Sequence, residues 1–461
     1  MDRYDFVIIG AGPAGEAAAH EARERGASVL IVDRRWFGGS CPHIGCVPSK
    51  ALLNSAARHH EEGDRYPWAR ASARRDYMVN RAPDAAEPDD SSHVDALERA
   101  GCRTLRGTGR IVGRGRVAIE GVAGSVEVEA ANIMVAVGSQ TKVPPLPGIE
   151  EVPYWTNREA TLARELPRSL LVLGGGPTGC ELAQVYARFG VPTEIVQSGA
   201  RIMPTDHPRN AAAITFGLER DGVRVRTGVR ATRARAGDGA DGAHVVDLDD
   251  GSTAEGHAIL LAVGRSFPLA DLGLEVYGID PSVRGSLPAD GRLRIADGLW
   301  TIGDPAGPEL HTHQGHYQGE MAVRMALGED VRPDYRALPR ATYTDPEAAS
   351  VGLTLEQAID AGYDAFEKVA DFARSAKGYS VEAETGHVTI VVDRSSRELL
   401  GAAMACPDAS AAIHEAVVAI KARVPVDVLA DTIHAFPSTS RIFNGLFKEA
   451  WRELDPVGSV A

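Results

Sequence analysis

No stretch of this 461-residue chain approaches the about 20 consecutive apolar residues that a helix needs to cross a bilayer. Basic side chains are also outnumbered: there are 49 Lys and Arg against 63 Asp and Glu, a formal net charge of −14. This charge argues against a general affinity for nucleic acid or for an anionic membrane. The hydrophobic (44%) and charged (24%) fractions are those of an ordinary soluble globular protein.

Cysteine is scarce, with five residues in the chain. The first residues lead directly into an apolar segment, so we expect no signal peptide and a cytoplasmic location. In a reducing compartment a disulfide is more often catalytic than structural. Three cysteines stand alone, without metal-site spacing, and we expect small core residues and no metal there: Cys102, Cys180 and Cys406.

The other two cysteines, Cys41 and Cys46, lie in the segment GGSCPHIGCVPSK. A helix is expected from Ser49 onward, with Pro48 in its first turn. The free N–H groups and the dipole of a helix N-terminus favour the reactive thiolate. A pair in this place can close into a disulfide and be reopened by two electrons. A structural disulfide and two buried cysteines without a role are the alternatives.

A dinucleotide-binding unit precedes the cysteines. The sequence predicts a buried strand over residues 5–9, a glycine-rich turn over 10–15, a helix over 17–25 and a second strand over 28–32 that ends at Asp33. The glycines permit a tight turn and the close approach of a pyrophosphate, and the acid can bond both ribose hydroxyls. The whole unit therefore predicts a bound dinucleotide.

The same pattern occurs a second time. A strand over 169–173 leads into the glycine run 174–179, a helix over 180–189 and a strand over 193–196. Two such sites fit a flavin and a nicotinamide dinucleotide held in separate domains so that their rings can meet.

These segments together resemble the class I pyridine nucleotide-disulfide oxidoreductases, which include dihydrolipoamide dehydrogenase, glutathione reductase and mercuric reductase. Residues 132–139 are similar to the family's crossing between its nucleotide domains, 259–265 to the return, and 299–304 to its second flavin motif. The resemblance implies an α/β fold with two Rossmann-like domains and a C-terminal α+β dimerisation domain. The implied bounds are 1–150 with 265–333 for FAD, 151–264 for NAD(P) and 334–461 for dimerisation.

The resemblance also implies which residues hold the cofactors. For FAD these are Gly10, Gly12, Pro13, Ala14, Gly15, Asp33, Gly39, Ser40, Lys50, Gly138, Ser139, Gly303 and Asp304. For the nicotinamide cofactor they are Gly174, Gly176, Thr178, Gly179, Gln197, Ser198, Arg201 and Gly264. Lys50 is expected to pair with Glu181 beside the flavin, where a buried cation stabilises the reduced, anionic ring; two unrelated surface charges are the alternative.

The choice of nicotinamide cofactor depends on the end of the second strand. Gln197 carries no charge that repels a 2′-phosphate, Ser198 can bond one, and Arg201 lies within a few residues. An acid at that position would favour NADH instead. We therefore expect NADPH, with NADH as the alternative.

The chain departs from the family near its C-terminus. Disulfide reductases of this class carry His-x-His-Pro-Thr-x-x-Glu, and the second histidine, oriented by the glutamate, exchanges protons with the first redox cysteine across the dimer interface. This chain has HAFPSTSR, so Phe436 stands in place of the base and Arg441 in place of its partner. A general base contributes about 10²–10⁴ in rate, so we expect slow dithiol–disulfide exchange. Candidates to replace it are His434, His43 and the cluster His311, His313 and His316.

The resemblance predicts a homodimeric, FAD-dependent enzyme that passes hydride from NAD(P)H through FAD to the Cys41–Cys46 disulfide. Cys46 is expected to face the flavin and Cys41 to meet a small thiol, disulfide or thioether substrate. Tyr66, Trp68 and Tyr77 are candidates to line the substrate channel, with ordinary packing as the alternative.

Three other functions remain open. 2-Ketopropyl-coenzyme M oxidoreductase/carboxylase shares the phenylalanine and a Gly-Gly-Ser-Cys-Pro-His motif, and there an apolar ring keeps protons from a carbanion. A carboxylase that cleaves a C–S bond reductively is therefore one alternative. A quinone or oxygen reductase with bystander cysteines is another, and a non-enzymatic flavin-loaded dimer is the third.

Overall fold

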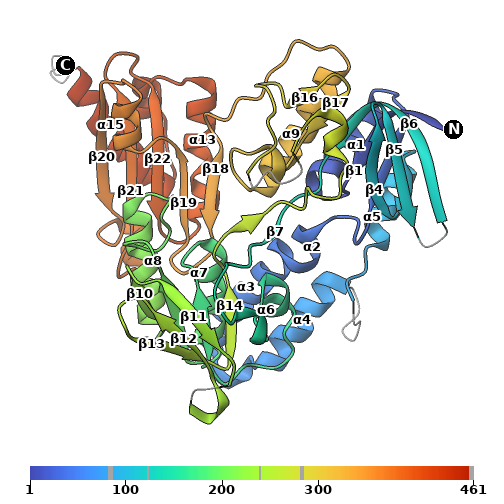
Figure 1. Ribbon diagram of the computed structural model, residues 1–461. Coiled ribbons are helices and arrows are strands. Elements are labelled where there is room, and N and C mark those ends of the chain that lie inside the picture. The colour runs from blue at the N-terminus through green and yellow to red at the C-terminus, as the bar shows by residue number, and fades with distance from the viewer. Residues whose placement is uncertain (81–86, 122–123, 238–239, 281–284, 456–461) are drawn as a thin grey trace.

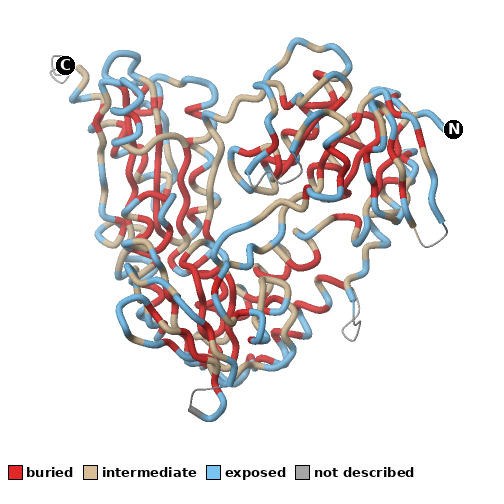
Figure 2. The backbone as a smooth tube through the Cα atoms, viewed as in Figure 1, coloured by how far each residue is buried: buried red, intermediate tan, exposed pale blue. Residues whose placement is uncertain are grey.

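Three large sheets, with hydrophobic clusters packed against them, organise the chain (Figure 1). The structure is a computed structural model that describes residues 1–80, 87–121, 124–237, 240–280 and 285–455. Figure 2 shows that the buried residues concentrate in these sheets and in the helices against them, while the connecting loops are exposed. The predicted α/β class is confirmed.

The first sheet contains eight strands, and five of them run parallel in the order β17-β6-β1-β2-β3. Its strands are β1 (Arg3–Ile9), β2 (Val29–Asp33), β3 (Arg103–Arg106), β4 (Thr108–Gly113), β5 (Arg116–Gly121), β6 (Gly124–Val135), β16 (Arg294–Ala296) and β17 (Leu299–Thr301). The apolar run of β1 is buried on both faces, as the inner strands of a parallel sheet require. Because β17 pairs with β6, this sheet combines two pieces of chain that lie far apart in sequence.

Helix α1 (Pro13–Glu24) follows the first glycine turn and packs against α9 (Thr312–Ala326). The contact is close because Gly319 of α9 lies against the backbone of Ala14, leaving no room for a Cβ atom. The two helices cover one face of the sheet. This packing brings the chain after β17 next to the turn after β1.

The second sheet is parallel, in the order β10-β9-β8-β14, and lies at the bottom of Figure 1. Its strands are β8 (Leu170–Leu173), β9 (Thr193–Gln197), β10 (Arg224–Thr227) and β14 (Ala258–Leu261). Helices α7 (Pro177–Arg188) and α8 (Pro208–Arg220) belong to this unit, and an antiparallel sheet flanks it: β11 (Ala231–Arg235), β12 (His244–Leu248) and β13 (Thr253–Gly256). Two Rossmann-like units, as predicted, are therefore present.

The third sheet is antiparallel, in the order β18-β19-β22-β21-β20, and lies at the left of Figure 1. Its strands are β18 (Pro339–Thr342), β19 (Ala348–Gly352), β20 (Ala365–Asp371), β21 (His387–Asp393) and β22 (Leu399–Ala405). Helices α13 (His414–Ala422), α14 (Val426–Asp431) and α15 (Ser440–Leu454) pack with it in one core.

Four helices connect or support these units near the centre of Figure 1: α2 (Ser40–Ile44), α3 (Cys46–Glu62), α4 (Trp68–Asn80) and α6 (Asn157–Leu162). Smaller elements used below are α5 (Ser91–Arg99), β7 (Gln140–Thr141), β15 (Arg265–Ser266) and the short turns η2 (Ile149–Glu151) and η5 (Asp304–Ala306). None of the helices in the described part of the chain combines the length and the hydropathy that a membrane crossing requires.

Candidate active site

Both cysteines of the pair lie at helix starts. Cys41 is in α2 and Cys46 is the first residue of α3, with Gly45 between the helices. A Cβ atom on Gly45 would lie 2.9 Å from the carbonyl oxygen of Ser40, so the turn requires glycine. The predicted start of the helix at Ser49 is therefore wrong by one turn, and the correction puts Cys46 at the N-terminus itself.

The side chains of Cys41 and Cys46 influence each other's charge. Both residues are free thiols in this structure, and a hydrogen bond joins their side chains. That hydrogen bond lowers the pKa of Cys46 most; burial opposes it, and Thr312 and Lys50 add to the lowering, which brings the pKa to about 6. The hydroxyl oxygen of Thr312 lies 3.6 Å from Cys46 Sγ. Because Cys46 holds the negative charge, the pKa of Cys41 is raised, and burial raises it further.

Lys50 and Glu181 form an ion pair, with Lys50 Nζ 2.8 and 3.0 Å from the two carboxylate oxygens. Lys50 is on α3, one turn after Cys46, and Glu181 is buried on α7 of the second sheet unit. Burial alone would lower the pKa of Lys50, but Glu181 outweighs it and the pKa is raised. Lys50 therefore stays a cation near the sulfur of Cys46.

Tyr343 completes this ion pair from the third sheet unit. Its backbone N–H donates to Glu181 Oε1 at 3.0 Å, and Lys50 Nζ lies 4.5 Å from the centre of its ring. Two residues on, the backbone N–H of Asp345 donates to Gln184 Oε1 at 2.7 Å. The loop between β18 and β19 is thereby fastened to α7, and a cation–π contact fixes the ammonium group from a third side.

The first glycine turn is shaped by close backbone approaches. Gly10, at φ +109°, passes so near Ala136 that a Cβ atom would collide with the carbonyl oxygen of that residue. Gly15 faces Gly10 in the same way. Asp33, at the end of β2, accepts a hydrogen bond from the backbone N–H of Ala11 at 2.8 Å. Glycine is therefore required here, as the dinucleotide pattern predicts.

Three motifs from different parts of the chain meet at one point. Ser139, just before β7, donates a hydrogen bond to Asp304 of η5. Arg265 of β15 reaches both: its guanidinium bonds the hydroxyl and carbonyl oxygen of Ser139 and lies 3.8 Å from Asp304 Oδ2. The predicted residues Gly138 and Ser139, Gly264, and Gly303 and Asp304 are thus brought together.

The second glycine turn repeats the first. Gly174, at φ +107°, approaches Ala262 as Gly10 approaches Ala136, and Gly179 faces Gly174. At the end of β9, Gln197 Oε1 accepts from the backbone N–H of Gly175 at 2.9 Å, which is the contact that Asp33 makes in the first unit.

Arg201 does not extend toward the end of β9. Its guanidinium donates to the carbonyl oxygens of its own loop, among them those of Pro204 at 3.0 Å and Asp206 at 2.8 Å. Ser198 is exposed beside Gln197. A phosphate at the end of β9 would therefore find a hydroxyl and a neutral amide, while Arg201 is already engaged.

None of the candidate histidines is hydrogen-bonded to either sulfur. His43 is buried, its Nε2 bonds the carbonyl oxygen of Phe37 at 2.8 Å, and burial lowers its pKa. His311 and His313 stack on each other with ring centres 5.0 Å apart, and burial lowers the pKa of both. His316 is exposed. His434 is held by Glu415, 2.6 Å from its Nε2.

The C-terminal residues Phe436 and Arg441 lie away from the cysteines of the same chain. The side chain of Phe436 is 73% exposed and that of Ile433 is 95% exposed. Arg441 donates to Asn444 Oδ1 at 2.9 Å. The single chain therefore leaves an apolar surface uncovered at this segment.

A groove of about 420 Å³ adjoins Cys46 between α3 and α4. It is lined by Cys46, Val47, Lys50, Ala51, Asn54, Arg74 and Met78. Of the predicted channel residues, Tyr66 and Trp68 are instead buried in the core, where Trp68 donates to the carbonyl oxygen of Arg164 at 3.0 Å. For these two residues the structure shows the alternative, ordinary packing, and Tyr77, which is exposed, does not line the groove.

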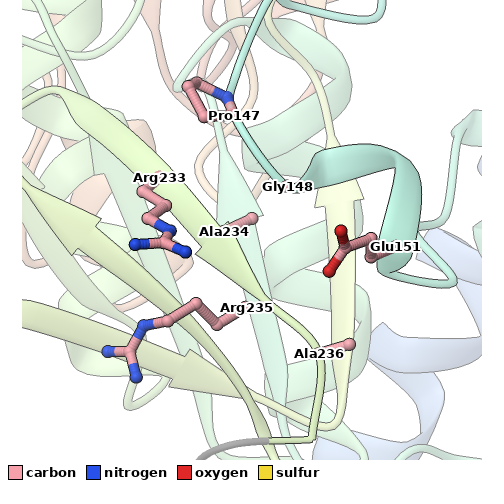
Figure 3. Close-up of a pocket in the computed structure, with 7 residues that line it drawn as sticks. All are labelled: Pro147, Gly148, Glu151, Arg233, Ala234, Arg235 and Ala236. Carbon is pink, nitrogen blue, oxygen red and sulfur yellow. The ribbon is translucent and has the colours of Figure 1, made fainter.

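A second hollow, of about 500 Å³, lies between η2 and β11, and neither Cys41 nor Cys46 lines it (Figure 3). Arg233 and Arg235 extend from the strand, on the side away from Glu151 in this view, and Arg235 pairs with Asp247 at 2.8 Å. Within the described ranges, no group of three or more His, Cys, Asp or Glu side chains is arranged to hold a metal ion.

Comparison with known proteins decides the family. Residues 4–326 match the family described as pyridine nucleotide-disulphide oxidoreductase, and residues 338–446 match the dimerisation domain of that family. The chain belongs to the pyridine nucleotide-disulphide oxidoreductases. Members of this family use FAD and a pyridine nucleotide, and the C-terminal sheet unit is their dimerisation domain.

Individual members of the family align over nearly the whole chain. Dihydrolipoyl dehydrogenase of Chlorobaculum tepidum is 32% identical and covers 95% of each chain. The Cu(II) complex of the HOCl-induced flavoprotein disulfide reductase RclA from Escherichia coli superposes with a TM-score of 0.85 at 26% identity, over 97% of this chain and 100% of that one. LpdA from Mycobacterium tuberculosis gives a TM-score of 0.85 at 27% identity, over 97% and 99%.

The residues present in this oxidoreductase fit FAD. Gly10 and Gly15 admit no Cβ atom, as the tight turn and the close packing of the helix on the strand in a dinucleotide-binding unit require, and Asp33 stands at the end of β2. Next to this turn, a Cβ atom on Gly39 would come 2.6 Å from the Cα atom of Gly12. Glycine is therefore needed on both sides of the place where a phosphate group would enter.

Three site residues were missed by sequence reasoning. Arg265 follows the predicted Gly264 in the same motif, so its place was available as a signal. Thr312 and Tyr343 reach the site only because the chain folds. Thr312 lies 266 positions after Cys46, and Tyr343 lies 162 positions after Glu181. No local pattern marks either of them.

Proposed function

We propose that this oxidoreductase uses NAD(P)H and FAD to reduce the Cys41–Cys46 disulfide, and that the dithiol passes the electrons to sulfur compounds that need no proton from the enzyme. Disulfides and thioethers with an acidic leaving group meet this condition. The observation that carries the proposal is that Thr312, Lys50 and Cys41 act on the thiol of Cys46, while no histidine of the described residues is hydrogen-bonded to either sulfur.

The absence of a base depends on Phe436 and Arg441. In the homodimer that the dimerisation domain suggests, we expect the partner subunit's Phe436 to lie against the cysteine pair. The exposure of Phe436 and Ile433 supports an interface at this segment. A phenyl ring neither accepts nor donates a proton, so the proton of Cys41 has to pass to the thiolate of Cys46 or to solvent before Cys41 attacks.

When bound, FAD would supply the route by which two electrons from the nicotinamide reach the cysteine disulfide. Lys50 stabilises negative charge beside Cys46, and Glu181 keeps that lysine charged. Cys41 then attacks one sulfur atom of a disulfide and releases a thiolate. Cys46 attacks the mixed disulfide, releases the second thiolate and restores the Cys41–Cys46 bond.

Both released thiolates leave most readily when their own pKa values are low, because no acid protonates them in this site. An aromatic disulfide satisfies this requirement, whereas an alkyl disulfide such as lipoamide does not. The proposed substrates are therefore sulfur compounds whose leaving thiolate does not need to be protonated by the enzyme.

We assign FAD to residues 1–150 with 265–333, the nicotinamide cofactor to 151–264 and dimerisation to 334–461, of which 456–461 lie outside the described residues. The pairing of β17 with β6 supports the divided FAD domain. For the nicotinamide cofactor we propose NADPH with weak discrimination, since Gln197 and Ser198 tolerate a phosphate while Arg201 is occupied by its own loop. A cytoplasmic location is part of the same proposal.

Turnover with two disulfides tests the function. We expect NADPH oxidation with an aromatic disulfide to exceed that with lipoamide by about 10²-fold or more, the amount a general base contributes. Cys41→Ser should abolish turnover with both. Equal rates with the two acceptors would contradict the missing base, and a fully active Cys41→Ser variant would show that electrons bypass the pair.

Reduction of Cu(II) is a second candidate, because RclA, which superposes over nearly the whole chain, has been solved as a Cu(II) complex. Thiolates bind copper well, and two Cu(II) ions accept the two electrons of one NADPH without taking a proton. Copper would be a substrate here. The test is anaerobic NADPH oxidation with Cu(II), which should consume two ions per NADPH and fail in Cys46→Ser.

A further inference from the structure

The groove between α3 and α4 carries a charge that nothing described in the chain balances. Seven residues line it, and none is acidic. Two of them are cations: Lys50, which Glu181 neutralises at 2.8 Å, and Arg74 of α4, which is exposed. Among the described residues, Arg74 has only the ring of Tyr77 for a partner, 5.9 Å away.

The lack of an acidic partner for Arg74 among the described residues is unusual in a chain with more acidic than basic side chains. Arginines on the helices around the groove are otherwise engaged: Arg58 pairs with Glu62 at 2.9 Å, and buried Arg75 pairs with Asp76 at 2.7 Å. Arg158, on α6, reaches Glu87 at 3.2 Å. Arg70 of α4 also lacks an acidic partner among the described residues, but it stacks on Tyr66 and does not line the groove, whereas the unneutralised guanidinium of Arg74 does.

The rest of the lining is apolar or neutral. Val47 and Ala51 of α3 and Met78 of α4 give the groove an apolar wall, and Asn54 adds one neutral amide. Met78 lies one helical turn after Arg74, so the guanidinium and the apolar wall belong to the same face of α4. A ligand with an apolar body and one negative group matches this lining.

We propose that Arg74 binds the anionic group of the acceptor, so that the substrates of this site are small organosulfur anions whose sulfur lies at the Cys46 end of the groove, where the side chain of Cys41 meets that of Cys46. Figure 1 shows α3 and α4 side by side, and the groove between them reaches from Arg74 to Cys46. The inference rests on the proposed function, because it names the acceptor of that same cysteine pair. A guanidinium is suited to the task, since its planar donors bind a carboxylate in two places.

Two reagents test the subsite on the FAD-loaded enzyme. 5,5′-Dithiobis(2-nitrobenzoate) carries two carboxylates, and 4,4′-dithiodipyridine is neutral; both release thiolates of low pKa, so neither needs an acid in the site. The quantity measured is the ratio of kcat/KM for the dianion to kcat/KM for the neutral disulfide, with NADPH saturating.

In Arg74→Gln we expect this ratio to fall about fivefold, which is the contribution of a partly exposed ion pair, and to do so through KM. Arg74→Lys should keep most of the ratio. The matched control is Arg70→Gln, one turn earlier on α4, where the guanidinium stacks on Tyr66 at 4.6 Å and does not line the groove; its ratio should equal that of the parent.

An unchanged ratio in Arg74→Gln would overturn the proposal. An equal fall in Arg70→Gln would also overturn it, because the effect would then come from the general positive charge of α4 and not from a contact with Arg74. Failure of the proposed function has a different signature. In that case Cys41→Ser would reduce both reagents at the parent's rate, whatever Arg74 does. Raising the salt concentration should weaken only the dianion's kcat/KM, and only when Arg74 is present.

Discussion

The segment that holds Cys41 and Cys46 and the segment at residues 434–441 differ in the chemical groups that they present. Around Cys46 the chain assembles a helix N-terminus, the hydroxyl of Thr312 and the ammonium group of Lys50, all of which stabilise a thiolate. The C-terminal segment instead presents Phe436, and its one histidine is held by Glu415. Under the proposed function, this site keeps its provision for electron transfer and lacks the histidine that would move protons.

The largest effect should come from the cysteine segment. Cys46→Ser removes the thiolate and the capacity to store two electrons, so we expect turnover with an aromatic disulfide to fall by at least about 10³-fold. Steady-state NADPH oxidation measures this. Cys102→Ser, at a buried position outside the site, is the control and should retain activity. Comparable losses in the two variants would mean that thiols matter only for folding.

Restoring the C-terminal segment should have the next largest effect. In the variant that combines Phe436→His and Arg441→Glu, a base and its carboxylate partner return together. We expect turnover with lipoamide to rise about 10–100-fold, the lower part of the range for general base catalysis, while turnover with an aromatic disulfide changes little. If both acceptors respond alike, proton transfer is not what separates the two segments.

Substitution of Lys50 tests how far a neighbouring positive charge lowers the pKa of Cys46. Lys50→Met should raise the pKa of Cys46, which is about 6 in the parent, by about one unit, because one opposite charge nearby shifts a pKa by that amount or more. The thiolate forms as pH rises through the pKa, so at pH 6.5 the variant should be mostly thiol and the parent mostly thiolate. Ultraviolet thiolate absorbance against pH checks this. Lys50→Arg, which keeps the charge, should stay near the parent value.

The sequence predicts the parts of the site that are local. The two glycine turns, the cysteine pair and Asp33 and Gln197 at the ends of their strands depend on a few neighbouring residues, and the structure has them as the pattern implies. The pairing of Lys50 with Glu181 came from family resemblance, since no spacing rule links two helices in different units.

What the sequence did not predict depends on packing between distant elements. Thr312 and Tyr343 join the site because α9 and the β18–β19 loop pack beside it. Trp68 was expected in a channel, but it packs against Tyr186 and Phe189 of the second sheet unit. Arg201 was expected near a phosphate, but the carbonyl groups of its own loop satisfy its donors first.

The smallest effect should come from the second nucleotide unit. Gln197→Glu keeps an oxygen that accepts from the N–H of Gly175 but adds a charge that repels a 2′-phosphate. We expect the ratio of kcat/KM for NADPH to that for NADH to fall about fivefold, the equivalent of one exposed charge interaction. Ser198→Ala serves as the control, with a smaller change. A ratio that rises in Gln197→Glu would contradict the proposed position of the phosphate.

Anaerobic titration of the FAD-loaded enzyme with NADPH, followed by its absorbance spectrum between pH 5 and 9, tests most directly that the pair stores electrons without a base. We predict a long-wavelength thiolate–flavin band at two electrons, present above and lost below a single apparent pKa near about 6, the value for Cys46. Bleaching of the flavin without this band, or a second ionisation in the same range that reports a base near the sulfurs, would contradict the account.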